Sequence, residues 1–396
     1  MYTVWVPCTD RLWGITHFFG KEVPAGADMD WLVGTVYGIG FSAYGLAYWL
    51  SERFWPGREV FFQSPDLGTR QNGIKLGVLQ GLIWALVVWN LWDTGISLGG
   101  LLDLGNRNPG NILFSAAWAH PWVDLLSNAL PVCLFLDFYR KEKPGYYWWI
   151  LFLIWFGFAL LGGWRYRIVL MVLFFGIYNL RKLNGFKPIH LAAGAILIVL
   201  MALLTLNRMA LAKRQFDVLT MDVRQFDLPA LNMEFSNHRT FRCTLEWMKN
   251  RQEKPPGVIS WWNFVEQRLV QKSKFQDGQR PRPWILETTK AWIPPGWPWN
   301  PNPAVTQIEE GFLSFGWYGM CIWMALFGIW VAFLDQLSRG KLGMLFQAIC
   351  VALLFQWISR GFFLFQIQIT LVCFIPVLVL ALPGPYLPYD SKQHKA

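Results

Sequence analysis

Arginines near the ends of apolar stretches are the residues of this sequence that first suggest chemistry. Arginine carries a planar guanidinium group that binds phosphate oxygens in pairs. The candidates for binding an anionic substrate are Arg165, Arg167, Arg239, Arg242, Arg280, Arg282 and Arg360. Arg165, Arg167 and Arg360 lie at short turns between apolar stretches, where extension toward lipid headgroups stays an open alternative. The other candidates lie in a long polar segment, where many arginines are solvated surface.

A carboxylate and an imidazole are the candidates for moving a proton. Glu309 and Glu310 stand directly before a long apolar stretch. Acidic side chains there complement the positive end of a helix dipole, or accept a proton from a reacting hydroxyl. His238 precedes Arg239 and Arg242, whose positive charges favour the neutral imidazole that a base requires, although a single histidine is often structural. We assign Glu310 and His238 as the candidate catalytic residues.

Motifs for metals and nucleotides are missing from the sequence. It contains no HExxH pair, no GxxxxGK(S/T) loop and no GxGxxG loop, which hold zinc, nucleotide phosphates and dinucleotides respectively. Its six cysteines show no CxxC spacing, so neither a zinc site nor a redox pair is indicated. We therefore expect chemistry that uses no metal ion and no cofactor.

The composition indicates a membrane protein. Of the 396 residues, 54% are hydrophobic and only 15% are charged, whereas soluble globular proteins carry about 25% charged residues. A soluble chain of this length needs more ionisable residues to cover its surface. The net charge of +10 does not indicate nucleic acid, because the basic residues lie between apolar blocks. The predicted partner is a lipid bilayer, with no nucleic acid.

About nine apolar blocks approach the roughly 20 residues that a helix needs to cross a bilayer. Short basic connections mark the cytoplasmic side, which places the N-terminus outside and the C-terminus inside. Pro121, Asp124 and Pro131 interrupt the third block, so we expect it to be either broken or partly interfacial. Residues 162–164 are expected to form a tight turn between the fourth and fifth. The blocks are approximately 31–50, 76–95, 116–138, 147–163, 166–181, 189–207, 313–335, 343–359 and 362–383.

A long polar segment between the sixth and seventh blocks falls on the outer side. Proline-rich turns divide it, and we expect short helices at about 208–224 and 258–275. The predicted fold is an all-α polytopic membrane protein with one large, partly helical extracytoplasmic loop. Its parts are a six-helix membrane domain at 1–207, the loop at 208–310, and a three-helix membrane domain with a cytoplasmic tail at 311–396.

A short segment where the chain re-enters the membrane resembles a family signature. Residues 310–319, Glu-Gly-Phe-Leu-Ser-Phe-Gly-Trp-Tyr-Gly, are similar to the E-x-Y/F-x-N/S-F-G-x-x-G pattern of bacterial oligosaccharide repeat-unit polymerases (O-antigen polymerases, Wzy type). Residues 292–298 resemble that family's iPRxxWP stretch, with proline in place of its arginine, for which Arg280 and Arg282 are candidate replacements. The Gly-Trp-Arg-Tyr-Arg turn at 163–167 resembles the family's outer-turn G-x-R element.

The resemblance implies a metal-independent, inverting glycosyl transfer between two undecaprenyl-pyrophosphate-linked oligosaccharides. It places this reaction on the outer face of the bacterial inner (cytoplasmic) membrane, with a surface polysaccharide or exopolysaccharide as product. Arginines would stabilise the departing pyrophosphate, and Glu310 or His238 would orient or deprotonate the acceptor hydroxyl. A membrane protein that regulates chain length is a further candidate partner.

Two other functions fit the same features. An O-antigen ligase uses the same lipid-linked donor with another acceptor, and overall topology does not separate it from a polymerase. A transporter of lipid-linked glycans should show polar residues in paired broken helices at the middle of the membrane. Here the arginines gather near the membrane surface, which favours an outward-facing enzyme.

Overall fold

The computed structural model is mostly helical and divides into two compact units. The first unit comprises Met1–Val60, Ala192–Leu337 and Cys350–Gln368, and the second comprises Phe61–Leu191, Ser338–Ile349 and Ile369–Ala396. The structure describes residues 17–18, 21–54, 68–95, 120–140, 145–161, 165–182, 237–259, 262, 284–293, 305–336, 341–359 and 363–381.

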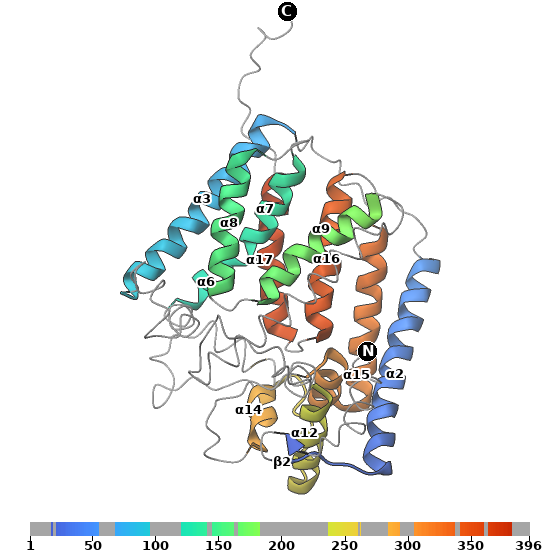
Figure 1. Ribbon diagram of the computed structural model, residues 1–396. Helices are drawn as coiled ribbons and strands as arrows, with labels where there is room; N and C mark the ends of the chain where they lie inside the picture. Colours follow the sequence, from blue (N-terminus) through green and yellow to red (C-terminus); the bar gives the residue numbers. More distant parts are fainter. Residues whose placement is uncertain are drawn as a thin grey trace, which may run out of the picture. The chain divides into compact units, whose positions relative to one another are not determined.

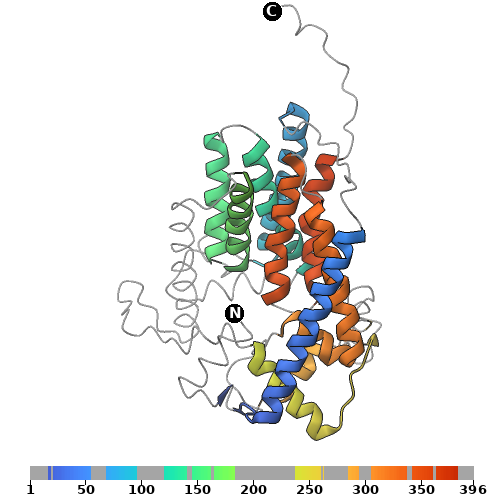
Figure 2. The same ribbon diagram turned by 90° about the vertical axis from the view of Figure 1, so that its right-hand side faces the viewer.

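In the first unit two long helices lie side by side, as both ribbon views show (Figures 1 and 2). A two-strand antiparallel hairpin and two shorter helices belong to the same unit. Its elements are β1 (His17–Phe18), β2 (Lys21–Glu22), α2 (Ala27–Phe54), α12 (Asn237–Arg251), α14 (Trp284–Ala291) and α15 (Gln307–Gln336).

Glycines let α2 and α15 approach each other closely. A Cβ atom added to Gly328 of α15 would lie 2.3 Å from the carbonyl oxygen of Tyr44, so no other residue fits there without a backbone shift. A Cβ atom added to Gly40 of α2 would lie 2.9 Å from the side chain of Ile308. Small residues at helix interfaces permit this kind of approach.

The second unit confirms the predicted break in the third apolar block, whereas the predicted turn at 162–164 lies outside the described residues. The third apolar block forms two helices separated at Asn128. The helices of this unit are α3 (Arg70–Asp93), α6 (Pro121–Ser127), α7 (Ala129–Arg140), α8 (Tyr146–Leu161) and α9 (Arg165–Lys182).

Aromatic side chains fill the core of the second unit. Phe135 of α7 is fully buried, and its ring centroid lies 5.5 Å from that of Phe174 and 6.1 Å from that of Tyr178 on α9. Trp148 of α8 donates a hydrogen bond of 2.8 Å from its indole nitrogen to the carbonyl of Leu134. The polar edge of this tryptophan is therefore satisfied while its ring packs in the core.

The last two helices, α16 (Lys341–Ser359) and α17 (Phe363–Ala381), each contribute residues to both units. In the first unit Trp357 stacks on Phe327 with centroids 5.8 Å apart. In the second unit Phe346 contacts Phe374 at 5.0 Å.

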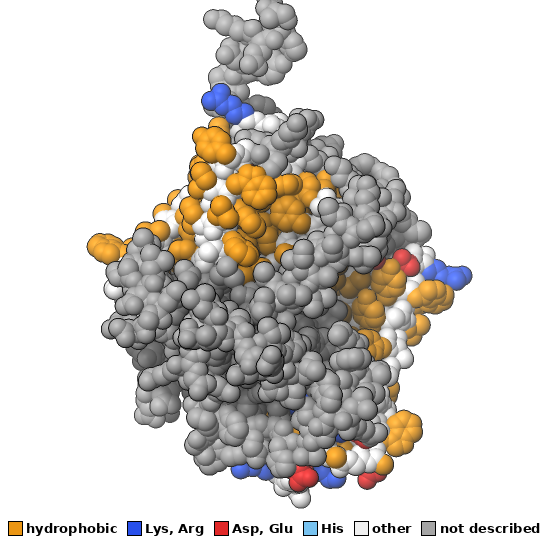
Figure 3. Space-filling model, in the orientation of Figure 1, with side chains coloured by type: hydrophobic (Ala, Val, Ile, Leu, Met, Phe, Trp, Pro, Cys, Tyr) orange, Lys and Arg blue, Asp and Glu red, His pale blue; other side chains and the backbone are white. Residues whose placement is uncertain are grey.

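Three described helical stretches are long and apolar enough to cross a membrane, namely Arg70–Asp93, Trp122–Arg140 and Gln307–Asp335. Apolar side chains gather on the exposed surface over α3 and α8 (Figure 3). The exposed apolar residues of α8 include Tyr147 and Leu153. Such a large exposed apolar surface suits contact with lipid. These stretches indicate a membrane protein, while the count of nine spans stays a prediction.

The polar segment at 208–310, which we call the outer segment after its predicted side, contains two helices that the sequence did not predict, α12 and α14. Of the two helices expected there, 208–224 lies outside the described residues and 258–275 lies almost wholly outside them, as does the sixth apolar block at 189–207.

Candidate functional site

The helix α15 reverses direction at Gly316, within the segment that resembles the family signature. Gly316 has φ 67° and ψ −161°, a conformation that is essentially restricted to glycine. After the reversal, the indole nitrogen of Trp323 donates a hydrogen bond of 3.3 Å to the side-chain oxygen of Gln307. In a straight helix these residues would stand about 24 Å apart along the axis. The residues before Gly316 therefore form a separate short helix that folds back on the longer one.

Two further glycines stabilise this reversal. The amide of Gly257, in the outer segment, donates a hydrogen bond of 2.7 Å to the carbonyl of Ser314, which is close to the point where the helical pattern ends. Gly257 itself has φ 67°. A Cβ atom added to Gly319 would lie only 2.0 Å from the Cβ of Phe315. The F-G-x-x-G part of the signature-like segment thus has a physical explanation in the chain reversal.

Glu309 is held in a capping box at the start of the short helix. The Thr306 amide donates to the Glu309 carboxylate, and the Glu309 amide donates to the Thr306 hydroxyl at 3.3 Å. This reciprocal pair satisfies two amides that the first helical turn leaves without partners. The other carboxylate oxygen accepts a hydrogen bond from the hydroxyl of Tyr37 on α2. Both oxygens of Glu309 are used for structure.

Glu310 lies on a different face of the short helix from Glu309. At 100° per residue, Glu310 shares its face with Gln307 one turn earlier and Ser314 one turn later. All three side chains are buried. The structure thus separates two adjacent carboxylates that the sequence presented as a pair. Gln307 and Ser314 were not among the candidates from sequence, and only the i, i+3, i+7 spacing around Glu310 signalled them.

The helix α12 carries three of the predicted candidates, His238, Arg239 and Arg242, and all three are buried. The helix packs on the short helix of α15 through the rings of Phe241 and Phe312, whose centroids lie 6.0 Å apart. The structure therefore brings these candidates and Glu310 into the same unit on neighbouring elements.

Arg242 already has partners for its terminal nitrogens. One terminal nitrogen contacts the carboxylate of Asp30 on α2, and the other donates to the carbonyl of Pro24 at 3.2 Å. A carboxylate beside the guanidinium neutralises its charge, which lowers the cost of burying it. Asp30 was not among the candidate residues from the sequence.

Four buried hydrogen-bond donors lack an acceptor among the residues that the structure describes. They are Thr240 Oγ1 and Arg242 Nε on α12, and Gln307 Nε2 and Ser314 Oγ on the short helix of α15. Buried polar atoms are normally paired, and leaving one unpaired costs about 1–3 kcal/mol. The four donors therefore favour a ligand rich in acceptor oxygens, such as a phosphate or a sugar.

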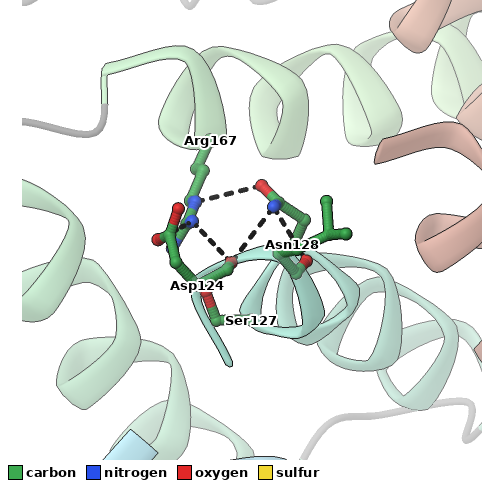
Figure 4. A network of polar contacts seen from close by, with 5 residues as sticks. Asp124, Ser127, Asn128 and Arg167 are labelled. Carbon is green, nitrogen blue, oxygen red and sulfur yellow. Dashed lines mark hydrogen bonds and ion pairs between the residues drawn. The ribbon is translucent and has the colours of Figure 1, made fainter. Parts of the chain in front are cut away.

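Arg167 belongs to the second unit, where it forms an internal network with α6 (Figure 4). Its guanidinium donates to the carboxylate of Asp124 at 2.6 Å and to the side-chain oxygen of Asn128 at 3.1 Å. Arg167 is almost fully buried. The role of Arg167 that the geometry supports directly is to connect α9 to the broken third block.

The remaining arginine candidates are not described in detail. Arg165 begins α9, but its side chain lies outside the described part of the structure, as do Arg280, Arg282 and Arg360 entirely. Within the described ranges, no three His, Cys, Asp or Glu side chains gather in a way that could hold a metal ion.

Neither protein family models, nor curated proteins, nor solved structures give a match to this chain. The features that bear on function are therefore the buried donors on α12 and on the short helix of α15, together with the motif resemblance.

Proposed function

We propose that this protein is a membrane glycosyltransferase that polymerises undecaprenyl-pyrophosphate-linked oligosaccharide repeat units on the outer face of the bacterial inner membrane. The observation that carries the proposal is the buried face of the short helix, where Glu310 lies between two donors without described acceptors. A carboxylate flanked by hydrogen-bond donors suits a polyhydroxylated substrate, because it binds a hydroxyl hydrogen while its neighbours bind ring or phosphate oxygens.

In the proposed reaction, the acceptor hydroxyl attacks the anomeric carbon of the donor sugar. Glu310 takes the proton of this hydroxyl as the new carbon–oxygen bond forms. The bond between the anomeric carbon and the pyrophosphate breaks, and undecaprenyl pyrophosphate leaves with the bonding electrons. Attack from the opposite face inverts the anomeric configuration, and no metal ion takes part.

We assign the stabilisation of the leaving pyrophosphate to donors on α12, a helix of the outer segment. Arg239 lies beside Thr240, and the Nε of Arg242 lacks a described acceptor. Preorganised donors that face developing negative charge are commonly the largest single contribution to catalysis. His238 is the second candidate base on the same helix. Arg165, Arg167, Arg280, Arg282 and Arg360 stay predictions as substrate contacts.

The arrangement of the second unit supports the proposed topology. The Arg140 guanidinium covers Gly73, 2.7 Å from where a Cβ atom would lie, so the end of α7 meets the start of α3. Asp93 and His120 join the end of α3 to the start of α6 at 2.7 Å. The positive-inside rule places the end of α7 and the start of α3 on the cytoplasmic side of the membrane. It places the end of α3 and the start of α6 on the outer side, so both contacts agree with the proposed topology.

The experiment compares adjacent carboxylates in purified protein reconstituted in bilayer discs with the lipid-linked repeat unit of the source cell. Glu310→Gln should slow polymer formation by about a hundredfold or more. Glu309→Gln is the matched control and should keep most activity, because glutamine also completes a capping box.

A folded Glu310→Gln variant that polymerises at the parental rate would remove Glu310 from the mechanism. Parental protein that transfers glycan to a different acceptor, without lengthening the lipid-linked chain, would indicate a ligase. Parental protein that moves the lipid across the bilayer without transfer would indicate a transporter.

A further inference from the structure

A second cluster of polar and aromatic side chains lies in the other unit, where α3 ends beside the start of α6 (Figure 1). His120 precedes α6, and its Nε2 lies 2.7 Å from a carboxylate oxygen of Asp93, the last residue of α3. The ring of Trp89 lies 4.7 Å from the imidazole of His120 and 6.0 Å from the ring of Trp122. Three rings therefore form a continuous row beside one carboxylate.

A proline and a helix cap restrict the backbone on both sides of this cluster. Pro121 follows His120 as the first residue of α6, and proline restricts the residue before it to extended conformations. The α3 end is capped at Thr94, whose amide and hydroxyl both donate to the carbonyl of Asn90. Sites on capped helix ends keep their geometry without a ligand, which reduces the cost of binding.

The Asp93–His120 pair has one acceptor atom to spare on each partner. Nε2 of His120 donates to the carboxylate of Asp93, which places the imidazole proton on Nε2 and leaves Nδ1 as an acceptor in the neutral ring. Neither Nδ1 nor the second carboxylate oxygen makes a hydrogen bond to another described residue. The side chains of His120 and Asp93 are 25% and 51% exposed, so a ligand can reach both.

We propose that this cluster binds a saccharide, in a site separate from Glu310. Two neighbouring acceptors suit two hydroxyl groups of a sugar ring, and the exposed faces of Trp89 and Trp122 suit its flat apolar face. An isolated tryptophan at a helix end is explained by the membrane interface. Anchoring at the membrane interface does not explain why an accessible pair of Asp93 and His120 lies beside the two tryptophan rings. The choice of a saccharide as the ligand rests on the proposed function, in which the substrate and the product are both glycans.

An organic cation is the competing ligand, because aromatic rings with a carboxylate also bind quaternary ammonium groups. The carboxylate here already carries an imidazole on one oxygen. A quaternary ammonium group has no hydrogen to donate to Nδ1 of His120, whereas a sugar hydroxyl can donate to it. The cluster therefore favours a neutral polyhydroxylated ligand.

The test is saturation-transfer NMR on the full-length protein in bilayer discs. The probe is a set of oligosaccharide fragments released by mild acid from the surface polysaccharide of the source cell, and so free of lipid and phosphate. Trp122→Ala should weaken binding by about fivefold, as expected for loss of one stacking face. Asp93→Asn should weaken it by a similar factor.

The matched control is Trp92→Ala, because Trp92 lies at the same helix end and is 79% exposed but has no described contact with the row. It should leave binding unchanged. Equal losses in Trp92→Ala and Trp122→Ala, no transfer to any fragment with the parental protein, or displacement of the fragments by millimolar tetramethylammonium would each overturn the proposal.

The experiments distinguish failure of the saccharide site from failure of the proposed glycosyltransferase function. Glu310→Gln should bind the fragments as the parental protein does, because Glu310 belongs to the other unit. Loss of fragment binding with intact polymerisation would therefore refute the saccharide site alone. Intact fragment binding in a protein that never polymerises would refute only the glycosyltransferase.

Discussion

Replacing Gly316 with alanine should destabilise the protein by about 1–3 kcal/mol. This is the cost of holding a residue with a side chain in a backbone region that glycine alone populates readily. Gly316 has φ 67° and ψ −161°, so the variant must keep this strain or straighten α15. Straightening would break the contact between Gln307 and Trp323 and move Glu310 away from the long helix. Polymer formation should therefore fall together with stability.

The free energy of unfolding would be measured in mixed micelles, with Gly38→Ala as the control. Gly38 lies within α2, and a Cβ atom added there meets nothing within 4 Å. Alanine at such a helical position should be neutral or stabilise by up to about 1 kcal/mol. If Gly316→Ala unfolds at the same free energy as Gly38→Ala, the chain does not reverse at this glycine.

A cross-link tests the same reversal without relying on stability. Cysteines placed at positions 311 and 320 in a variant that lacks the native cysteines should form a disulfide on mild oxidation. A Cβ atom added to Gly311 lies 3.5 Å from the Cα of Met320, close enough for a disulfide, whereas a straight helix would separate the two residues by about 13.5 Å along its axis. Cysteines at 323 and 334, both within the long helix, should not react. A 311–320 pair that stays reduced would refute the folded-back helix.

Three further predictions follow from buried contacts and from the topology. Tyr37→Phe removes a donor from the buried Glu309 carboxylate and should cost about 1–3 kcal/mol in unfolding measurements, while an unchanged stability would mean that the bond is absent. Arg167→Ala leaves its carboxylate partner without a counter-charge and should cost about 3 kcal/mol, which a variant of parental stability would contradict. A cysteine at Asn250, which is exposed on α12, should react with a membrane-impermeant maleimide in intact cells, whereas one at position 184 should react only after permeabilisation. The reverse labelling pattern would place residues 208–310 inside.

The sequence predicted the break in the third apolar block better than the helices of the outer segment. The break near Asn128 follows from a local rule, because prolines limit the backbone whatever surrounds them. The helix α12 is rich in polar residues, yet Thr240 and Arg239 are buried in it. Its position depends on contacts with α2 and α15, which are distant in sequence. Prediction of a helix from sequence relies on apolar residues at helical spacing, and a helix that buries its polar face lacks this pattern.

The roles of the two adjacent glutamates, Glu309 and Glu310, could also be predicted only in part from the sequence. The spacing from Thr306 to Glu309 is a capping box, so the sequence contained the signal that Glu309 is structural. The face that Glu310 shares with Gln307 and Ser314 gains its meaning only once the helix folds back at Gly316. A straight helix over 307–336 would place the same residues on an ordinary helix end.

The ion pairs of the structure change how the arginines are understood. From sequence, each arginine near the membrane surface was a positive charge available to a phosphate. In the structure Arg167 lies against Asp124 and Arg242 against Asp30, so these two charges are already compensated. A pyrophosphate that entered beside Arg242 would have to share it with Asp30 or bind through donors that have no described acceptor. Binding would then depend on hydrogen-bond geometry more than on net charge, because a compensated guanidinium keeps its directional donors while losing most of its long-range field.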